Sequence, residues 1–443
     1  MERWWTMFDR IEDALKWMNQ ETNPLKRENL DKIKLAMEYL GHPEEGLNVI
    51  QITGTNGKGS VTSFLKSLFL AAGVKVGTFT SPHIIRFNER ISYRGEDITD
   101  ADLLKYLNRI YDLNNYMART SYGRLTYFEI YTAIMFLYFH DLQPDVCLIE
   151  VGIGGLNDCT NVVEAQYAVL VTIALDHLAE LGGSVEEVAY QKSGIIKSGA
   201  KVFLGQLPES TLPVIQERLL QENAQGFFFG QDFAFQPLSL DLVNGSQFSF
   251  WSDSKEGEGN YRLSMIGEHQ MHNASLALEV FCHWMDDHDQ EISKEATYQA
   301  LLENKWQGRM EKVSNQPLIY LDGAHNEAGI LALKATIESY MADQSVKVLF
   351  AGLNRKNQEA HLELLNKFPV EAIYLTPFDH YESFTSDQWQ ALLEDLGSPK
   401  IRVINDWQAY LDSIDPKEAS LTIVTGSLYF VSQVRNYLHV SLV

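Results

Sequence analysis

The stretch that most constrains the fold runs from Val49 to Leu68 and reads VIQITGTNGKGSVTSFLKSL. An apolar run is followed by a loop rich in glycine and then by a sequence with helical periodicity. This order predicts a strand, a tight turn and a helix, the unit from which parallel sheets covered by helices are built. Glycines let backbone N–H groups approach a ligand, and the N-terminus of the helix adds positive potential. The stretch therefore predicts an α/β protein with a phosphate site.

The spacing inside this loop differs from the common phosphate-binding pattern G-x-x-x-x-G-K-[ST]. Counting back from Lys58, the first glycine of that pattern would fall at Ile52, and its hydroxyl residue would fall at Gly59. We predict that Lys58 supplies a point charge and that Ser60 supplies the hydroxyl for Mg²⁺. The alternative is a plain glycine turn with an exposed lysine, which the agreement of strand, loop and helix disfavours.

Short apolar runs alternate with helical periodicity through the first half of the chain, as in parallel strands joined by helices. Strands are predicted at residues 47–53, 74–81, 145–155 and 167–177, and helices at 60–73 and 126–141. Residues 226–262 differ, because apolar and polar residues alternate there around Asn-Gly and glycine-rich turns. That texture predicts antiparallel hairpins.

A second α/β region follows, with strands predicted at residues 318–326, 346–354, 371–377 and 421–427. Residues 301–317 have weak periodicity and mark the predicted junction. We therefore expect a two-domain α/β protein. Residues 1–305 would form an N-terminal P-loop NTPase-like domain, with a mainly parallel sheet plus a small antiparallel β section. Residues 306–443 would form a C-terminal Rossmann-like α/β domain.

Bulk composition narrows the functional class. A net charge of -23 argues against a nucleic-acid partner, because phosphate backbones need surfaces of Lys and Arg. Anionic small substrates would then have to be held by local positive charge. The cysteines Cys147, Cys159 and Cys282 form no C-x-x-C, which fits a reducing compartment. The first residues lack the order of a signal peptide, and no apolar run is long enough to span a membrane. We expect a cytoplasmic monomer.

Polar residues end several predicted strands, where ligands gather in open α/β sheets. Glu150 ends one strand, and a metal ligand and an ordinary rim acid are equally consistent with it. His177 follows another, as a metal ligand, a base or a solvated loop residue. Lys192 lies on a predicted helix, where a single lysine is normally a solvated charge.

Two further groups stand out. The loop SPHIIRFNERIS places Arg86 and Arg90 near Phe87, and either an aromatic anion or solvent would suit it. The stretch YLDGAHNEAG puts Asp322 directly after a strand, at a tight turn where a binding role is favoured. Arg309 either reaches phosphates across a cleft or is simply exposed.

Together these pieces resemble the folylpolyglutamate synthases and dihydrofolate synthases, within the Mur ligase superfamily. The similar segments fall in the family's order between about Asn48 and Arg435. They are TGTNGKGS, TSPHIIRFNERI, YFEIYTAIMF, EVGIGG with DCTNV, LDH with LGGSVEEVAYQKSGIIK, GEHQMHNASLAL, WQGRMEKV, LDGAHN and TGSLYFVSQVR.

The resemblance implies an ADP-forming ligase that joins L-glutamate to a folate or to dihydropteroate through an acyl phosphate. ATP and glutamate are expected at the cleft between the domains. The implied catalytic residues are Lys58, Lys192 and His177. The implied ATP contacts are Thr55, Asn56, Gly57, Lys58, Gly59, Ser60, Asn273, Arg309, Asp322 and His325.

The resemblance also implies two Mg²⁺ ions, one at Ser60 and Glu150 and one at His177 and Lys192. Lys192 would be carbamylated by CO₂, which turns it into an anionic oxygen ligand and requires a neutral amine first. Ser427 is implied at the glutamate. The implied folate loop comprises Ser81, Pro82, His83, Arg86, Phe87, Asn88 and Arg90.

The chain departs from the family pattern in two places. Leu156-Asn157 stands where the family often has Arg-Leu, and Arg355 and Asn357 replace two acids. The motifs do not separate a glutamate-chain extender, a dihydrofolate synthase and a bifunctional enzyme. Two rival functions are a Mur-type amino-acid ligase of cell-wall precursors and a P-loop regulatory ATPase.

Overall fold

The computed structural model describes residues 7–21, 29–255 and 257–438. These residues form two compact units. The first contains the described residues up to Ala234 together with Phe250–Glu258 and His272–Ala300. The second contains Phe235–Ser249, Gly259–Met271 and the described residues from Leu301 onward. None of the helices in the described ranges is both long and apolar enough to cross a membrane.

The first unit is built on an eight-stranded sheet of order β4-β3-β2-β5-β1-β6-β7-β8. Six neighbouring strands, from β2 to β8 in that order, are parallel, whereas β3 and β4 are antiparallel additions at one edge. The strands are β1 (Val49–Thr53), β2 (Val76–Phe79), β3 (Ile91–Tyr93), β4 (Glu96–Asp97), β5 (Val146–Glu150), β6 (Tyr167–Leu170), β7 (Lys201–Leu204) and β8 (Gln225–Phe228). The predicted mainly parallel sheet is confirmed.

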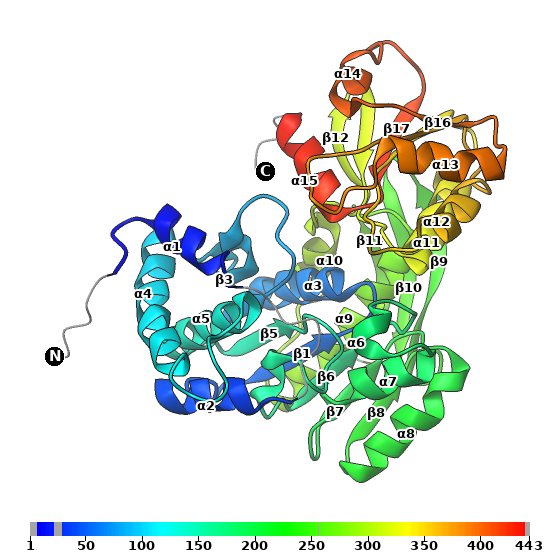
Figure 1. Cartoon of the computed structure of the whole chain (residues 1–443). Helices are drawn as coiled ribbons and strands as arrows, with labels where there is room; N and C mark the ends of the chain where they lie inside the picture. Colours follow the sequence, from blue (N-terminus) through cyan, green and yellow to red (C-terminus); the bar gives the residue numbers. More distant parts are fainter. Residues whose placement is uncertain (1–6, 22–28, 256, 439–443) are drawn as a thin grey trace. The chain divides into compact units, whose positions relative to one another are not determined.

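Helices join these strands, and α3 packs against β1, β2 and β5 (Figure 1). The helices are α1 (Ile11–Met18), α2 (Asp31–Leu40), α3 (Lys58–Ala71), α4 (Asp100–Met117), α5 (Tyr127–Leu142), α6 (Leu178–Leu181), α7 (Val185–Ser193), α8 (Leu212–Gln221), α9 (Glu268–Asp287) and α10 (Lys294–Glu303). Three 3₁₀ turns add to them: η1 (Phe87–Arg90), η2 (Cys159–Val162) and η3 (Glu209–Thr211).

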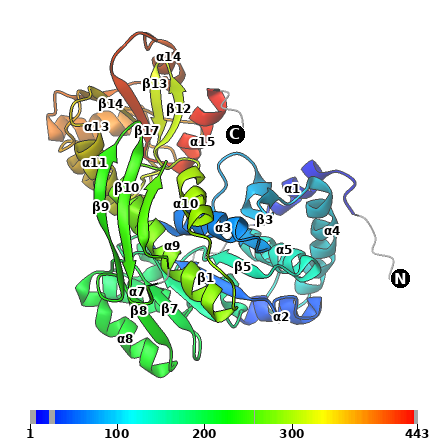
Figure 2. The same cartoon turned by 180° about the vertical axis from the view of Figure 1, so that it is seen from behind.

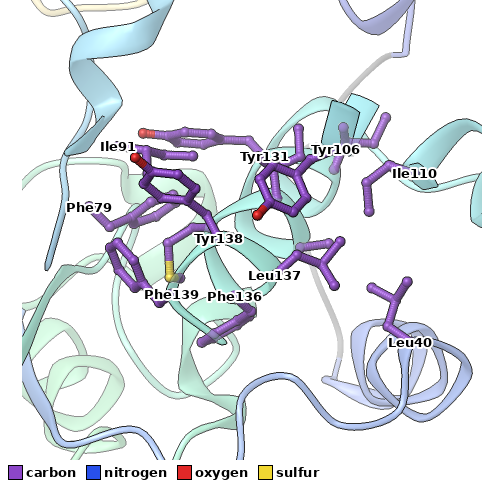
Figure 3. Close-up of a cluster of buried hydrophobic side chains, with 14 of the residues drawn as sticks. Leu40, Phe79, Ile91, Tyr106, Ile110, Tyr131, Phe136, Leu137, Tyr138 and Phe139 are labelled. Atoms are coloured by element: carbon purple, nitrogen blue, oxygen red, sulfur yellow. The ribbon is translucent and has the colours of Figure 1, made fainter. Parts of the chain in front are cut away.

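An extensive apolar cluster of the first unit includes most of α5. This helix is apolar on nearly every face, which is typical of a helix buried in a core. Figure 3 shows its aromatic side chains among those of α2, α4 and β2, including Leu40, Phe79, Tyr106, Tyr131, Phe136 and Phe139. The cluster packs against the sheet, and the loops that follow the strands lie at the carboxyl ends of the strands.

Three strands form a separate sheet of order β11-β10-β9, namely β9 (Phe233–Asp241), β10 (Gly245–Ser252) and β11 (Gly259–Leu263) (Figure 2). Short connections between neighbouring strands require antiparallel pairing, so the predicted hairpins are confirmed here. The prediction was wrong for residues 226–228. They lie in β8, which pairs in parallel with β7. A four-residue apolar strand carries too few residues to distinguish the two arrangements.

The second unit holds a six-stranded sheet of order β12-β13-β17-β14-β15-β16. All pairs are parallel except β12 with β13. The strands are β12 (Glu311–Asn315), β13 (Leu318–Leu321), β14 (Val346–Phe350), β15 (Ala372–Leu375), β16 (Ile401–Val403) and β17 (Leu421–Thr425). The helices are α11 (Glu327–Tyr340), α12 (Gln358–Leu365), α13 (Ser386–Leu396), α14 (Trp407–Asp412) and α15 (Leu428–Tyr437). The four predicted strands are confirmed, and β12 lies within the segment predicted as the junction.

Candidate functional site

The glycine loop begins where β1 ends, between β5 and β6. Its backbone is pinned to the chain that follows β6. The Thr55 N–H donates to the Thr172 carbonyl (2.9 Å), and the Asn56 N–H donates to Thr172 Oγ1 (2.9 Å). The Ala174 N–H donates to Thr55 Oγ1 (3.0 Å). The glycine loop is therefore fixed by hydrogen bonds to the segment that follows β6.

Gly57 precedes α3 with φ +86°, a left-handed conformation that favours glycine. A Cβ at this position would lie 2.6 Å from Asn273 Oδ1 and 2.8 Å from Val171 Cγ1. Asn273, on α9, thus packs directly against the backbone of the loop. This contact places one of the implied ATP residues beside the phosphate cradle.

Lys58 and Ser60 lie in the first turn of α3, and their side chains differ in hydrogen bonding. The Lys58 ammonium donates to the Gly54 carbonyl across the loop (2.9 Å). The Ser60 hydroxyl is buried and has no hydrogen-bond partner. A buried hydroxyl normally finds a partner, so this oxygen is suited to an incoming ligand such as a cation. The residues present therefore fit a phosphate with a divalent ion.

Glu150 ends β5 and pairs in register with Ile52 of β1. It is only 3% exposed, and one of its oxygens accepts a hydrogen bond from the Ser81 N–H (3.3 Å). A buried carboxylate at the carboxyl end of a central strand fits a hard cation. The same carboxylate links this edge of the sheet to the loop that starts at Ser81.

Lys192 lies on α7 and is 3% exposed. Burial lowers the pKa of its ammonium far below the usual value, and the charge of Lys58 lowers it further. Asp176 and Asp158 act in the opposite direction. The amine is thus favoured in its neutral, nucleophilic form, which is the form that reacts with CO₂. The solvated lysine that a lone helical position suggests is not what the structure shows.

His177 follows β6 and stands in the left-handed region, with φ +51°. Its N–H donates to Asp176 Oδ1 (2.8 Å). A residue other than glycine at positive φ is uncommon and often belongs to a functional loop. The predicted strand at 167–177 was too long, because β6 ends at Leu170. The two strands that pair with β6 end at the same level, because Leu170 pairs with the last residue of β1 and with the last residue of β7. Beyond Leu170 the chain therefore has no strand to pair with.

The loop at residues 81–90 is organised around one carboxylate. Glu89 accepts hydrogen bonds from three consecutive backbone N–H groups, those of Ile84 (3.0 Å), Ile85 (2.9 Å) and Arg86 (2.7 Å). Such a nest of amides around an acid fixes the loop conformation. The loop is therefore rigid rather than simply solvated.

Arg90 lies inside that loop, 8% exposed. Its Nε donates to His83 Nδ1 (2.7 Å), and its guanidinium faces the rings of Phe87, Tyr127 and Tyr131 at 5.0–5.7 Å. Burial, and then the charge of Arg90, lower the pKa of His83 to about 4. The cation and the aromatic groups expected from the sequence are thus brought together.

Other side chains of the loop have local partners. The Asn88 amide donates to the Ile98 carbonyl (2.7 Å) and to Asp100 (2.8 Å). Arg86 pairs with Asp97 (3.2 Å) and is exposed, as is Pro82. The outer face of the loop is therefore formed by Pro82 and Arg86, whereas Asn88 anchors its base.

In the second unit, Asp322 follows β13 and joins two turns. Its carboxylate accepts from the Met310 N–H (3.1 Å) and the Ala324 N–H (3.0 Å). Arg309 donates to the Gly308 carbonyl (3.0 Å). The turns that carry Arg309 and His325 are thus fastened to the end of one strand.

His325 and Ser427 lie at the ends of β13 and β17, which are neighbours in the sheet. His325 Nδ1 hydrogen-bonds the Gly323 carbonyl (2.8 Å). Ser427 precedes α15, and its hydroxyl is buried without a hydrogen-bond partner. The implied glutamate residue therefore has an oxygen suited to a ligand, like Ser60.

Three residues that interact with proposed site residues were not predicted from the sequence. Asp158 and Asp176 are the acids that interact with Lys192. His269 is half-buried near Asp322 and Arg309, and desolvation lowers its pKa. The signal for His269 was its place in GEHQMHNASLAL, four residues before Asn273 on the same helix. No spacing rule connects either acid to Lys192.

The departures from the family pattern have structural roles. Leu156 packs so closely on α7 that a Cβ at Gly194 would lie 2.4 Å from the Leu156 Cα. Arg355 pairs with Glu382 (3.6 Å). Asn357 caps α12 by accepting from the Ala360 N–H (3.2 Å).

Family models and known proteins match this chain over most of its length. Residues 52–281 match the Mur ligase middle domain, and residues 308–428 match the Mur ligase, glutamate ligase domain. The dihydrofolate synthase/folylpolyglutamate synthase of Bacillus subtilis is 35% identical over 440 residues, covering 98% of this chain and all of that protein. The folylpolyglutamate synthase of Lacticaseibacillus casei is 31% identical, covering 92% of this chain and 94% of that protein.

Solved structures are similar as well. The apo form of L. casei FPGS matches with a TM-score of 0.84 and 29% identity, covering 97% of this chain and 100% of that one. Mycobacterium tuberculosis folylpolyglutamate synthase complexed with ADP matches with a TM-score of 0.85 and 26% identity, covering 97% and 98%. With its glycine loop, buried carboxylate and buried lysine in place, the chain belongs to the dihydrofolate synthase/folylpolyglutamate synthase family of Mur ligases.

Proposed function

We propose that this protein uses ATP to join L-glutamate to a folate, to dihydropteroate, or to both, and releases ADP and phosphate. The observation that carries the proposal is the glycine loop after β1, in which the Lys58 ammonium reaches the Gly54 carbonyl and the buried Ser60 hydroxyl has no hydrogen-bond partner. FPGS structures with bound AMPPCP, and with AMPPCP and folate, support it. The related B. subtilis enzyme carries both activities in its name.

The chemistry requires an activated acid, because a carboxylate is a poor electrophile at neutral pH. The γ-phosphoryl group of ATP moves to the acceptor carboxylate and gives an acyl phosphate. The amine of glutamate attacks that carbonyl, and phosphate leaves with the bonding electrons. Lys58 offsets negative charge on the phosphoryl group in transit, a role of positioning and electrostatics.

Divalent ions supply further charge neutralisation when bound. Ser60 and Glu150 would hold one Mg²⁺, and His177 and Lys192 a second. Lys192 would add to CO₂ through its neutral amine, releasing a proton and gaining a carboxylate on Nζ. The buried position and lowered pKa of Lys192 support this proposal. ¹³C NMR with labelled bicarbonate should show a carbamate signal that Lys192→Met lacks, and an identical spectrum from both proteins would refute it.

Residues 1–305 would act as the ATP- and folate-binding domain, and residues 306–443 as the ligase domain. In the first, Ser81, Pro82, His83, Arg86 and Phe87 would contact the folate, while Asn88 and Arg90 would keep the loop in shape. In the second, Arg309, Asp322 and His325 would serve ATP, and Ser427 would serve glutamate. We further propose a cytoplasmic monomer; three buried free cysteines are consistent with a reducing compartment.

A two-acceptor assay tests the activity. The protein is incubated with ATP, Mg²⁺ and glutamate and with either a reduced folate or dihydropteroate, and the products are resolved by mass. Glutamate-dependent ADP release with a product heavier by one glutamyl group is expected from at least one acceptor. ATP hydrolysis that ignores glutamate would favour a regulatory ATPase and sink the proposal. Activity only with a cell-wall precursor would favour the other Mur-type ligases.

A further inference from the structure

The segment that carries Arg309 is held in an unfavourable backbone conformation. Gly308 and Met310, on either side of Arg309, both lie in the left-handed region, with φ +66° and +44°. Glycine tolerates this region, but methionine does not adopt it readily, and Met310 is also buried. Such strain persists only where the surroundings over-determine it. The contacts that hold this segment therefore indicate what the strained conformation does.

Three hydrogen bonds fix the segment. The Gly308 N–H donates to Glu311 Oε2 (2.9 Å), and the Met310 N–H donates to Asp322 Oδ2 (3.1 Å). The Gly323 N–H donates to the Gly308 carbonyl (2.8 Å). Both neighbours of Arg309 are thus tied through their backbones to acids or to the turn after β13.

Glu311 is itself oriented from a distant part of the chain. Its other oxygen accepts a hydrogen bond from Arg435 Nε (3.0 Å), although the two residues are 124 positions apart. Arg435 lies in the last turn of α15, and its side chain is only 4% exposed. A charge-assisted bond from a guanidinium is stronger and more directional than a neutral one. Arg435 therefore fixes the carboxylate that fixes Gly308.

The Arg309 side chain has little room to vary. Arg309 Nη1 donates to the Gly308 carbonyl (3.0 Å) and lies 2.2 Å from where a Cβ at Gly323 would be, so the guanidinium passes close over the Gly323 backbone. The backbone is hydrogen-bonded on both sides of Arg309, and the Gly323 backbone lies beside the guanidinium. The direction in which Arg309 projects is then set by the segment Gly308–Met310.

We propose that Arg435 is a positioning residue for the ligase reaction. Through Glu311 it holds the strained segment in the conformation from which Arg309 would serve ATP. The proposal rests on the role of Arg309 given under the proposed function. The Arg435 side chain is buried against Glu311, so its effect on the reaction would pass through Arg309.

A double-mutant cycle tests this dependence. Arg435→Met should lower kcat/KM for ATP by about tenfold, as the loss of a supporting partner typically does. In an Arg309→Ala background, the same change should alter kcat/KM by less than about twofold, because its target is gone. Arg402→Met, at an exposed arginine of β16, is the matched control and should leave activity unchanged. Arg435→Lys should restore part of the loss, since it keeps the charge.

Several results would overturn the proposal. One is an activity of Arg435→Met equal to that of Arg402→Met. Another is a loss that is additive with that of Arg309→Ala, as expected of a general loss of stability. If Arg435→Met does not fold, Glu311→Gln replaces it, and the same non-additivity is required. If wild-type protein shows no glutamate-dependent ADP release, the proposed function fails. In that case amide hydrogen exchange at Gly308 and Met310 tests whether Arg435 holds the segment. Exchange should be faster in Arg435→Met than in Arg402→Met, and equal rates would refute the positioning role.

Discussion

His83 is a half-buried ring whose surroundings favour its neutral form. Its Nδ1 accepts a hydrogen bond from Arg90, and burial together with the Arg90 charge lowers its pKa from 6.5 to about 4. A proton on Nδ1 would remove that bond and place two positive charges side by side. The loop at residues 81–90 therefore depends on a neutral histidine.

This dependence predicts a loss of stability in mild acid. Below pH 6.5 the unfolded chain binds a proton at His83, but the folded protein does not until about pH 4. The free energy of unfolding should fall as the pH drops through this window, by about 1–3 kcal/mol from this group. His83→Asn keeps an acceptor and should remove that part of the slope. Urea unfolding of both proteins at about pH 7.5 and about pH 4.5 measures the difference, and equal slopes would contradict the assignment.

Lys58 offers a second test at the scale of single residues. Its ammonium spans the glycine loop to the Gly54 carbonyl, so it is already directed into the cradle. Lys58→Ala should lower kcat by about 100-fold or more, because the charge acts on the phosphoryl group in transit. Lys75→Ala, at an exposed lysine just before β2, should leave kcat unchanged. Wild-type turnover in Lys58→Ala with an intact fold would remove Lys58 from the mechanism.

Helix α3 is flanked by two glycines that differ in one informative respect. Gly57 and Gly73 both have left-handed φ, +86° and +77°. A Cβ at Gly57 would collide with Asn273 and Val171, whereas a Cβ at Gly73 would meet nothing within 4 Å. Substitutions at these two glycines therefore separate the cost of a left-handed backbone from the cost of a steric clash.

The corresponding alanine variants should differ in both stability and binding. Gly73→Ala should cost about 1–2 kcal/mol through its backbone alone. Gly57→Ala should cost roughly 1–3 kcal/mol more from overpacking, and should weaken ATP-analogue binding by displacing the loop. Chemical denaturation and calorimetric titration measure the two effects. Equal losses in the two variants would mean that Asn273 does not constrain the loop.

At this scale the sequence predicted most of the fold, and the reason lies in the strands. Buried parallel strands such as β1, β5, β14 and β17 are continuous apolar runs, which the sequence displays directly. The edge strand β12 was missed, because its residues are half exposed and do not alternate cleanly. The residues that we propose for phosphate or metal binding were singled out from the sequence because several of them follow predicted strands. The pairing of Arg435 with Glu311 was not, since no local pattern links residues so far apart.

The whole molecule contains two units, each with its own sheet and apolar core. Such units need not unfold together, so heating should give more than one calorimetric transition. Ile134→Ala removes buried volume from the first unit, and Ile423→Ala from the second. Each should cost about 2–5 kcal/mol and lower a different transition. A single transition that both variants lower equally would show that the units melt as one.

The second unit is also discontinuous in the chain, and this bears on how the protein is made. Its strands β9 and β10 leave the ribosome long before Tyr340, whose hydroxyl hydrogen-bonds Ser246 of β10. Among the described residues the last strand is β17, which lies between β13 and β14 and pairs with both. A nascent chain that stops before Leu421 therefore exposes two unsatisfied strand edges, which are templates for misassembly. Translation must run almost to the final helix before this unit can close, so interrupted products would be marked for chaperones and proteases by their own open sheet.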